Sequence, residues 1–345
     1  LDSLLVASSH DLDLHTFKIT DQLSGRMMGI RADITPQAAR IDAHCLNKEG
    51  PVRLCYADSV LHTKPRGLMT SRVPIRVGAE LYGHSGVECD IELICLMHQT
   101  LGAAAIGDIH IVLGHVGIFR TLVKEANLST DTETLLFEAV QRKAYGEIDE
   151  VLDAAVQEQA INNMIKQLAR LSGGEATLSD AIGVFAAAPV TVQSELAELV
   201  AIVAGVKKRI PDITLCFDLC ELRGYEYHTG IVFAAYTPDY GRAVAKGGRY
   251  DDIGEVFGRA RPASGFDSDL KTLAKLTTRE FNLKSAIAAP YDDSDELLAL
   301  LEKLRDEGEV VISSFNQELS EQDQRELDCD RRIVQRGGMW VVEKF

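Results

Sequence analysis

The sequence predicts an α+β protein, in which helices flank an antiparallel sheet, and three observations point to this class. Strand-like segments come first, a long helical stretch follows, and strand-like segments then return. This order lacks the regular alternation of strand and helix that builds a doubly wound parallel sheet. The sequence also contains no GxxxxGK[ST] motif and no GxGxxG between a strand and a helix. We therefore expect neither a P-loop nor a Rossmann nucleotide site.

Changes in this pattern divide the chain into four expected domains. Residues 1–116 would form the first half of the sheet core, and residues 117–210 a helical insert. Residues 211–280 would complete the core, and residues 281–345 would form a small C-terminal α/β domain. A chain of 345 residues with 46% hydrophobic content is long enough for one large core and smaller units beside it.

The first half of the core predicts a hairpin, a helix and further strands in that order. Residues 16–33 alternate apolar and polar side chains around a turn at Ser24-Gly25, which is typical of a hairpin. Thr35 can cap a helix and Pro36 suits its first position. The elements expected next are strands at 52–61 and 75–82, a helix at 90–102 and a strand at 108–113.

The sequence pattern in the rest of the chain predicts a helical stretch and two further groups of strands. Apolar residues recur at three- and four-residue steps from about 117 to 206, with breaks at 172–174 and Pro189. The elements expected after it are strands at 213–222, 231–236, 285–290 and 310–315, a helix at 294–307, and a hairpin at 332–343 that turns at Gly337-Gly338.

Composition excludes several partners. A net charge of -16 opposes the phosphate backbone of nucleic acids, so we expect no nucleic-acid partner. The longest apolar runs, such as 181–188, are far shorter than the roughly 20 residues that cross a bilayer, so we expect no membrane partner. No basic region followed by an apolar segment opens the sequence, and export is not expected.

The cysteines lack the paired CxxC spacing of a zinc site. We interpret them as reduced core thiols of a cytoplasmic protein without a metal: Cys45, Cys55, Cys89, Cys95, Cys216, Cys220 and Cys329.

Four segments combine charged or aromatic side chains with glycine: 31–36 (RADITP), 77–83 (VGAELYG), 223–230 (RGYEYHTG) and 247–251 (GGRYD). Glycine lets a backbone approach a ligand closely. Asp33, Glu80 and Glu226 could hold an ammonium group or an imidazole, and Arg223 could hold a carboxylate. Together the segments predict a pocket for a small zwitterion.

Each of these residues also has a purely structural interpretation. A single carboxylate at a strand end is commonly solvated or ion-paired. His228 could serve as a structural hydrogen-bonding residue, Arg249 as a member of an ion pair, and Tyr250 as part of the core. The spacing of single residues does not decide between the two interpretations.

The four segments, in this order, resemble histidyl-tRNA synthetase, and the resemblance extends from about residue 16 to residue 273. RADITPQAAR stands where class II synthetases have a strand-to-helix element after motif 1, and VGAELYG matches the end of motif 2. RGYEYHTG and GGRYD match the two histidine-specific motifs, and GFDSDL the start of motif 3. The resemblance implies a class II aminoacyl-tRNA synthetase-like antiparallel sheet flanked by helices, with a helical insert and a small C-terminal α/β unit.

The resemblance also implies a histidine site, made of Asp33, Thr35, Arg76, Glu80, Arg223, His228 and two wall residues, Tyr227 and Tyr250. Asp33 and Thr35 would face the amino group of bound histidine. Glu80 would face the imidazole, with His228 beside it, and Arg223 would meet the carboxylate. A desolvated carboxylate opposite an imidazole nitrogen discriminates strongly against side chains that lack this group.

Two positions depart from the synthetase pattern. Arg76 stands where synthetases usually have a glutamine near the amino group, and His228 replaces a usual tyrosine.

The sequence lacks the arginines with which class II synthetases hold ATP. Counting back from VGAELYG places His62 at the first arginine and Lys64 where an acidic residue usually follows. In GFDSDLKTL, Thr272 takes the place of the second arginine. Each lost charged contact is worth about 1.5 to 3 kcal/mol. Lys271 and Arg72 are the cations that could compensate. We expect no adenylate formation and no catalytic residue.

A synthetase-like body without ATP arginines is similar to the regulatory subunits of short-form ATP phosphoribosyltransferase. GHVGIFRTL, RGYEYHTGIVFAAY and GGRYDDIGEVFGRARPASGF match that family in detail, and the C-terminal region is acidic, as at 291–296. This resemblance implies a hetero-octamer with a catalytic subunit, activation of that subunit, and feedback inhibition by L-histidine in histidine biosynthesis, without a cofactor. Two alternatives are a divergent histidyl-tRNA synthetase and a pseudo-synthetase binding module of another assembly.

Overall fold

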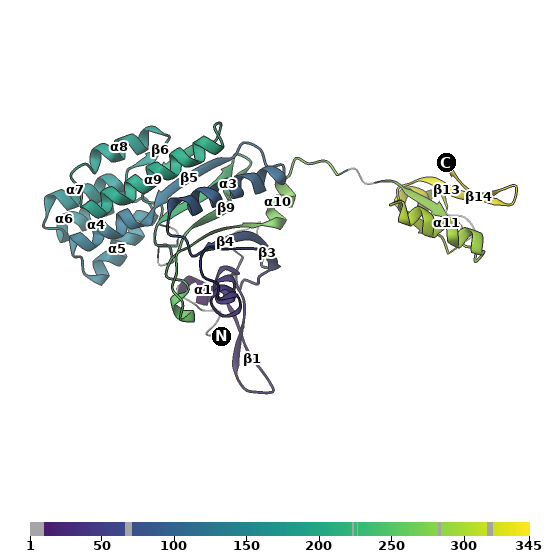
Figure 1. Ribbon diagram of the computed structural model, residues 1–345, viewed down its shortest axis with the longest axis horizontal. Coiled ribbons are helices and arrows are strands. Elements are labelled where there is room, and N and C mark those ends of the chain that lie inside the picture. Colours follow the sequence, from purple (N-terminus) through teal and green to yellow (C-terminus); the bar gives the residue numbers. More distant parts are fainter. Residues whose placement is uncertain (1–9, 66–70, 223, 226, 282–283, 316–319) are drawn as a thin grey trace. The chain divides into compact units, whose positions relative to one another are not determined.

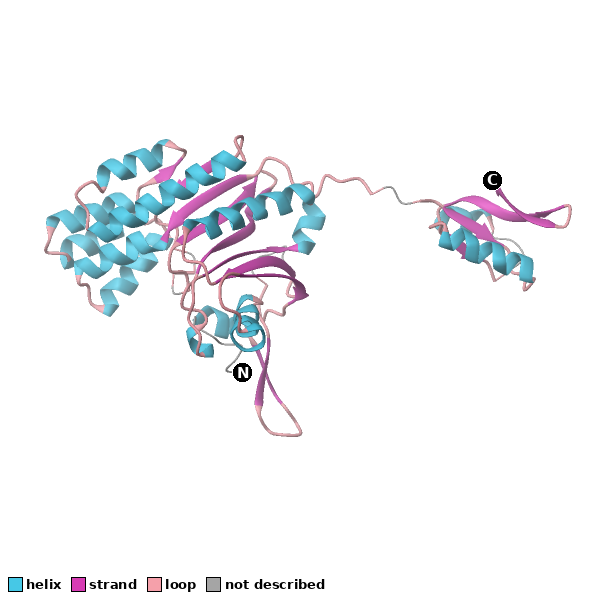
Figure 2. Cartoon of the chain, viewed as in Figure 1, coloured by secondary structure: helices cyan, strands magenta, loops and turns pink. Residues whose placement is uncertain are grey.

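The computed structural model describes residues 10–65, 71–222, 224–225, 227–281, 284–315 and 320–345. It contains two compact units, Leu1–Thr278 and Arg279–Phe345, which we describe separately. Both units combine helices and strands (Figure 2). This composition agrees with the predicted α+β class.

An eight-stranded sheet forms the base of the first unit, in the order β3-β4-β10-β9-β8-β5-β7-β6. Its strands are β3 (Val52–Ser59), β4 (Ile75–Tyr82), β5 (His110–His115), β6 (Ser172–Gly173), β7 (Thr214–Asp218), β8 (Ile231–Thr237), β9 (Tyr240–Arg249) and β10 (Ala263–Asp269). Neighbouring strands are antiparallel except β5 and β7, which are parallel. The predicted antiparallel sheet is therefore confirmed, with one parallel pair added.

Strands β9 and β10 lie in the middle of this sheet, although the sequence pattern does not predict them. Their residues include the small and polar stretches Lys246-Gly247-Gly248 and Ser264-Gly265, which have low intrinsic strand propensity. Glycine is needed here for close packing. A Cβ atom on Gly247 would lie 2.2 Å from the carbonyl oxygen of Gly265 and 2.6 Å from the Phe233 ring. The neighbouring strands thus impose an extended conformation on these segments.

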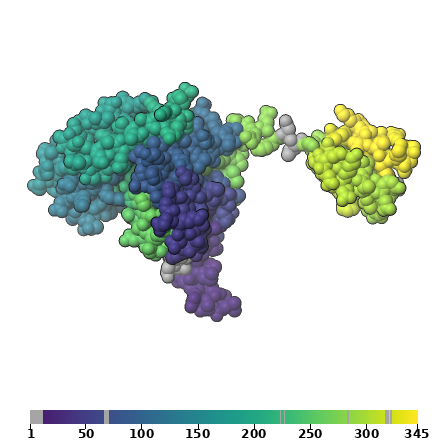
Figure 3. All heavy atoms as spheres, viewed as in Figure 1, coloured from purple at the N-terminus to yellow at the C-terminus, as the bar shows by residue number. Residues whose placement is uncertain are grey.

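Helices cover the sheet and form a separate layer beside it (Figure 1). The layer, which we call the helical module, is continuous in the space-filling view (Figure 3) and consists of α4 (Val116–Ala126), α5 (Thr130–Gln141), α6 (Tyr145–Ala155), α7 (Gln159–Leu168), α8 (Ala176–Val184) and α9 (Val190–Arg209). Helix α3 (Val87–Ala103) packs against both α9 and the sheet. The apolar periodicity therefore predicts this region well. Of the two expected breaks, one forms β6 and Pro189 precedes α9.

The hairpin and the helix after it stand where the sequence predicts them, whereas α1 is not predicted and one side chain has a different role. Helix α1 (His10–His15) leads to the hairpin of β1 (Phe17–Thr20) and β2 (Met27–Ile30), and α2 (Thr35–Arg40) continues into a π-helical turn, η1 (Ile41–Leu46). The expectation that Thr35 caps α2 is wrong, because Ile34 is the N-cap residue. The Thr35 hydroxyl instead donates a hydrogen bond to Glu80, on a neighbouring strand.

Two short helical segments complete the first unit. The 3-10 turn η2 (Glu255–Phe257) follows β9, and α10 (Leu270–Leu276) follows β10. The Asp269 side chain caps α10 by accepting a hydrogen bond from the backbone N–H of Lys271.

The second unit is a small α/β fold around a four-stranded sheet in the order β12-β11-β13-β14. Its elements are β11 (Ala286–Ala289), α11 (Asp295–Asp306), β12 (Val311–Ser313), α12 (Glu321–Glu326), β13 (Cys329–Arg336) and β14 (Met339–Lys344). Strand β11 is parallel to β12 and β13, while β13 and β14 form the predicted hairpin. Ile287, Leu297 and Ile333 fill its core. The polar helix α12 has no apolar periodicity from which it could be predicted.

Two of the cysteines are not the core thiols that the sequence predicts. All seven cysteines are free, and Cys89, Cys95 and Cys220 are buried as expected. Cys45 and Cys55 are exposed, so they are not core thiols. Within the described ranges, no helix has the length and apolar character that spanning a membrane requires.

Candidate functional site

The candidate site is centred on the carboxyl group of Glu80, which β4 carries into the interior at 2% exposure. Glu80 Oε1 accepts hydrogen bonds from the Thr35 hydroxyl at 2.8 Å and the Tyr56 hydroxyl at 3.2 Å. The second oxygen, Oε2, is buried and has no hydrogen-bond partner among the described residues. Burial raises the pKa of Glu80 well above its ordinary value, while the hydrogen bond from Thr35 opposes this shift.

Gly265 on β10 provides the space that Glu80 occupies. It lies directly opposite Glu80 in the register of β10 and β4. A Cβ atom on Gly265 would lie 1.7 Å from Glu80 Oε2 and 2.3 Å from the Tyr250 hydroxyl. Like Glu80 Oε2, the Tyr250 hydroxyl is buried without a hydrogen-bond partner among the described residues. Two polar groups that cost free energy when unsatisfied thus face the same space.

Carboxyl groups outnumber cations around this space. Asp33 and Asp267 add to Glu80, and burial together with these three groups raises the pKa of Tyr56. Arg76 forms an ion pair with Asp267, at 3.2 Å. Although burial opposes it, the charges of Asp267 and Asp33 raise the pKa of Arg76. The described part of the site therefore favours a positively charged group.

Three aromatic side chains form one wall. The ring centroids of Tyr227 and Tyr250 lie 5.1 Å apart, and the His228 ring lies 5.3 Å from Tyr227. Burial, followed by the charges of Asp33 and Glu80, raises the pKa of Tyr227 well above its ordinary value. Tyr250 is 3% exposed. It is therefore both a core residue, as its structural interpretation predicts, and part of the wall of the site.

Most of the predicted site residues come together in this arrangement. Thr35 contacts Glu80 directly, and the charge of Asp33 acts on both Arg76 and Tyr227. Arg223 and Glu226 lie outside the described residues. Sequence reasoning missed Tyr56, which faces Gly78 across β3 and β4. A Cβ atom on Gly78 would lie 2.6 Å from the Tyr56 hydroxyl, a signal that becomes visible only once the register is known.

Arg249 has the structural role that its residue type suggests. Its Nη2 lies 2.6 Å from Asp90 Oδ2 and also donates to the carbonyl oxygen of Gly86. Ser264 donates to the other oxygen of Asp90 at 2.7 Å. The expected ion-pair interpretation of Arg249 is therefore confirmed.

The positions of the missing ATP arginines are occupied by groups with other partners. His62 is buried, with Nε2 3.0 Å from the carbonyl oxygen of Ala32, and Thr272 donates to Asp269 at 3.0 Å. Of the two cations that could compensate, Lys271 donates to the Val73 carbonyl at 2.6 Å and Arg72 donates to that of His62 at 3.1 Å. Both cations therefore already stabilise backbone carbonyl groups.

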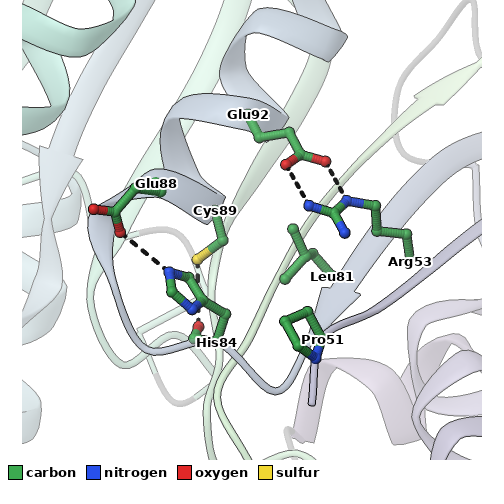
Figure 4. Close-up of a pocket in the computed structure, with 7 residues that line it drawn as sticks. All are labelled: Pro51, Arg53, Leu81, His84, Glu88, Cys89 and Glu92. Carbon is green, nitrogen blue, oxygen red and sulfur yellow. Dashed lines mark hydrogen bonds and ion pairs between the residues drawn. The ribbon is translucent and has the colours of Figure 1, made fainter.

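A hollow of about 160 Å³ lies apart from the Glu80 site and is lined by Pro51, Arg53, Leu81, His84, Glu88, Cys89 and Glu92 (Figure 4). Leu81 follows Glu80 on β4 and so faces the opposite side of the sheet. Arg53 pairs with Glu92 at 2.6 Å, and His84 lies 3.1 Å from Glu88. Because these charges satisfy one another, we assign no ligand to this hollow.

Comparison with known proteins first defines the class. Residues 1–273 match the family model of histidyl-tRNA synthetase. A crystal structure described as an ATP phosphoribosyltransferase regulatory subunit/histidyl-tRNA synthetase from Bacillus halodurans aligns over 94% of this chain and 84% of that chain, with a TM-score of 0.81 and 25% identity. The fold is therefore that of histidyl-tRNA synthetase-like class II proteins.

The relatives then specify the family. The ATP phosphoribosyltransferase regulatory subunits of Alkalilimnicola ehrlichii and Ectopseudomonas mendocina are 51% and 53% identical, over 99% of this chain and 86% of each relative. Residues 284–343 match the ATP phosphoribosyltransferase subunit HisZ C-terminal domain. This chain belongs to the family of ATP phosphoribosyltransferase regulatory subunits. The expectation of a non-catalytic regulatory subunit is thereby confirmed, and a divergent tRNA synthetase is not supported.

Proposed function

We propose that this regulatory subunit binds free L-histidine beside Glu80 and transmits feedback inhibition to a short-form ATP phosphoribosyltransferase catalytic subunit. The observation that carries the proposal is the buried, unpartnered Oε2 of Glu80, which shares its space with the Tyr250 hydroxyl above Gly265. An imidazole N–H can donate a hydrogen bond to Glu80 Oε2, while the other ring nitrogen stays available as an acceptor. An apolar side chain such as that of isoleucine would leave Glu80 Oε2 unsatisfied.

The charges around the site suit the rest of the ligand. Asp33 and Asp267 add negative charge, which Arg76 balances only in part, so the α-ammonium group of histidine would be stabilised there. We assign the α-carboxylate to Arg223, as the sequence predicts. The aromatic wall of Tyr227, Tyr250 and His228 would exclude water and strengthen these interactions.

The partner is the catalytic subunit of the same enzyme, and we propose a hetero-octamer that assembles in the cytoplasm. A chain described as belonging to an ATP phosphoribosyltransferase complex from Thermotoga maritima shares this fold, with a TM-score of 0.58 and 19% identity over 73% of this chain and 85% of that chain. Seven free cysteines suit a reducing compartment. Assembly would activate the catalytic subunit, and histidine would reverse the gain.

Calorimetric titration of amino acids into the isolated chain tests the ligand assignment. We expect L-histidine to bind, and isoleucine and lysine not to bind, because neither carries an imidazole. Equal binding of isoleucine or lysine would show that the Glu80 site does not select histidine. Thermodynamic linkage gives a second test, since substrates that favour the active assembly must weaken histidine binding by the same factor by which histidine weakens theirs.

A further inference from the structure

The loop that carries Tyr227 and His228 is held from outside by Arg120, a residue of α4 in the helical module. Arg120 Nη2 donates to the carbonyl oxygen of Tyr225 at 2.7 Å and to that of His228 at 2.9 Å. Its guanidinium also lies over the Tyr225 ring, with Cζ 5.0 Å from the ring centroid. One nitrogen therefore joins the two ends of the segment that presents the aromatic wall.

The loop itself is a tight turn built on Gly224. The Gly224 carbonyl accepts hydrogen bonds from the backbone N–H groups of Tyr227 and His228, both at 2.8 Å. Gly224 has a φ of 75°, and a Cβ atom there would lie 2.7 Å from His228 Nδ1. The His228 ring in turn lies against Gly248, where a Cβ atom would be 2.5 Å away. A small change in the spacing of the loop carbonyls would therefore move the His228 ring.

The outer side of the loop is embedded in α4 and α5. The Tyr225 ring packs against Phe119 of α4, with centroids 5.7 Å apart, and against Phe137 of α5, at 5.2 Å. The Tyr225 hydroxyl donates to Glu133 of α5 at 3.4 Å. Tyr225 thus anchors the loop in the helical module, while Tyr227 and His228 face the candidate site.

We infer that Arg120 is a positioning residue for the histidine site, and that it couples Tyr227 and His228 to the helical module. This inference rests on the proposed histidine site. It identifies α4 as the element whose position responds when histidine occupies that site. When bound histidine fixes the side chains of Tyr227 and His228, it also fixes the two backbone carbonyls that accept hydrogen bonds from Arg120. The position of α4 then depends on the ligand, and reciprocally the position of α4 sets the affinity for histidine.

Arg170 provides a matched control. It lies over the Tyr145 ring with Cζ 5.1 Å from the centroid, and it donates to the Lys166 carbonyl at 2.8 Å and to Asp149 at 2.8 Å. Arg170 thus makes the same kinds of contact as Arg120, but these contacts lie within the helical module. Its removal should reproduce the structural cost without disturbing the loop.

The experiment compares Arg120→Ala, Arg120→Lys, Arg120→Gln and Arg170→Ala by thermal unfolding and by calorimetric titration of L-histidine, well below each melting temperature. We expect Arg120→Ala to weaken histidine binding by about tenfold or more, because two backbone carbonyls lose their hydrogen bonds to a charged donor. Lysine retains a charged donor and should restore most of the affinity. Glutamine retains a neutral donor and should give an intermediate histidine affinity. This variant replaces Arg120→Ala in the comparison if the alanine variant does not fold.

Arg170→Ala should lower the melting temperature and leave histidine affinity at the wild-type value. The inference is wrong if Arg120→Ala or Arg120→Gln binds histidine as tightly as wild type, or if Arg170→Ala loses the same factor. It is also wrong if Arg120→Lys is as weak as the alanine variant. Failure of the wild-type chain to bind histidine would instead overturn the proposed function.

Discussion

Replacing Glu80 with glutamine should affect ligand binding and stability differently. The carboxyl group is buried, and only one of its two oxygens accepts hydrogen bonds from described residues. Glutamine has the same shape, and its carbonyl oxygen can still accept the hydrogen bonds from Thr35 and Tyr56. Its amide group cannot release a proton to become the carboxylate that would pair with a bound imidazole. We therefore expect Glu80→Gln to fold at least as stably as wild type and to bind L-histidine more weakly.

The magnitudes follow from the chemistry of the group. A lost charged hydrogen bond should weaken histidine binding by about 1 to 3 kcal/mol, or about 5- to 150-fold. Burial raises the pKa of Glu80 above its ordinary 4.5, so the folded protein keeps a proton that the unfolded chain releases. Wild-type stability therefore falls as the pH rises from 4.5 toward the folded pKa, by at most about 1.4 kcal/mol per pH unit. The stability of the glutamine variant does not fall in this way, because glutamine has no proton to release.

Two measurements check this prediction, with Glu92→Gln as the control. Glu92 is an exposed residue that pairs with Arg53, so its replacement should change neither quantity appreciably. Calorimetric titration gives the histidine affinity of each variant. Chemical denaturation across a pH series gives the stability difference between Glu80→Gln and wild type, which should grow as the pH rises. Unchanged histidine affinity, or a stability difference that shrinks with rising pH, would refute the reasoning.

Three further predictions concern other parts of the chain. The wild-type chain should give no histidine-dependent exchange of pyrophosphate into ATP, and activity above background would contradict the assignment of the motif positions. Gly265→Ala should abolish histidine binding and lower stability, because its Cβ would collide with Glu80, whereas Gly241→Ala, whose Cβ would meet nothing within 4 Å, should be tolerated. Burial raises the pKa of Glu195 from 4.5 to about 7, so wild-type stability should fall as pH rises between these values. Glu195→Gln should flatten that part of the stability profile, and an unchanged slope would contradict the shift.

The fold is predictable from sequence wherever side chains follow a simple period. The alternation in residues 75–82 predicts β4 with its observed bounds, and the three- and four-residue apolar period predicts the helical module. β9 and β10 were missed because the small residues that let them lie side by side, such as Gly247 and Gly265, have no strand propensity of their own. Their conformation depends on neighbouring strands that are distant in sequence.

The site shows a similar division. The motif order predicts Glu80, Thr35 and the Tyr227–His228 pair in one site. The local helix-start pattern assigns the Thr35 hydroxyl to helix capping, because it does not reveal that Glu80 is the acceptor. Tyr56 belongs to a strand with mostly exposed side chains and was not noticed. Both contacts with Glu80 arise from the strand register, which local sequence periodicity does not reveal.

We propose that histidine acts on the enzyme through the Glu80 site of this subunit. The most direct test measures phosphoribosyl transfer to ATP by the catalytic subunit, reconstituted with either the wild-type or the Glu80→Gln chain, over a range of histidine concentrations. We expect the inhibition curve of the variant complex to move to higher histidine by the same factor as its calorimetric dissociation constant. Superimposable inhibition curves for the two complexes would contradict the claim and place the effector site elsewhere.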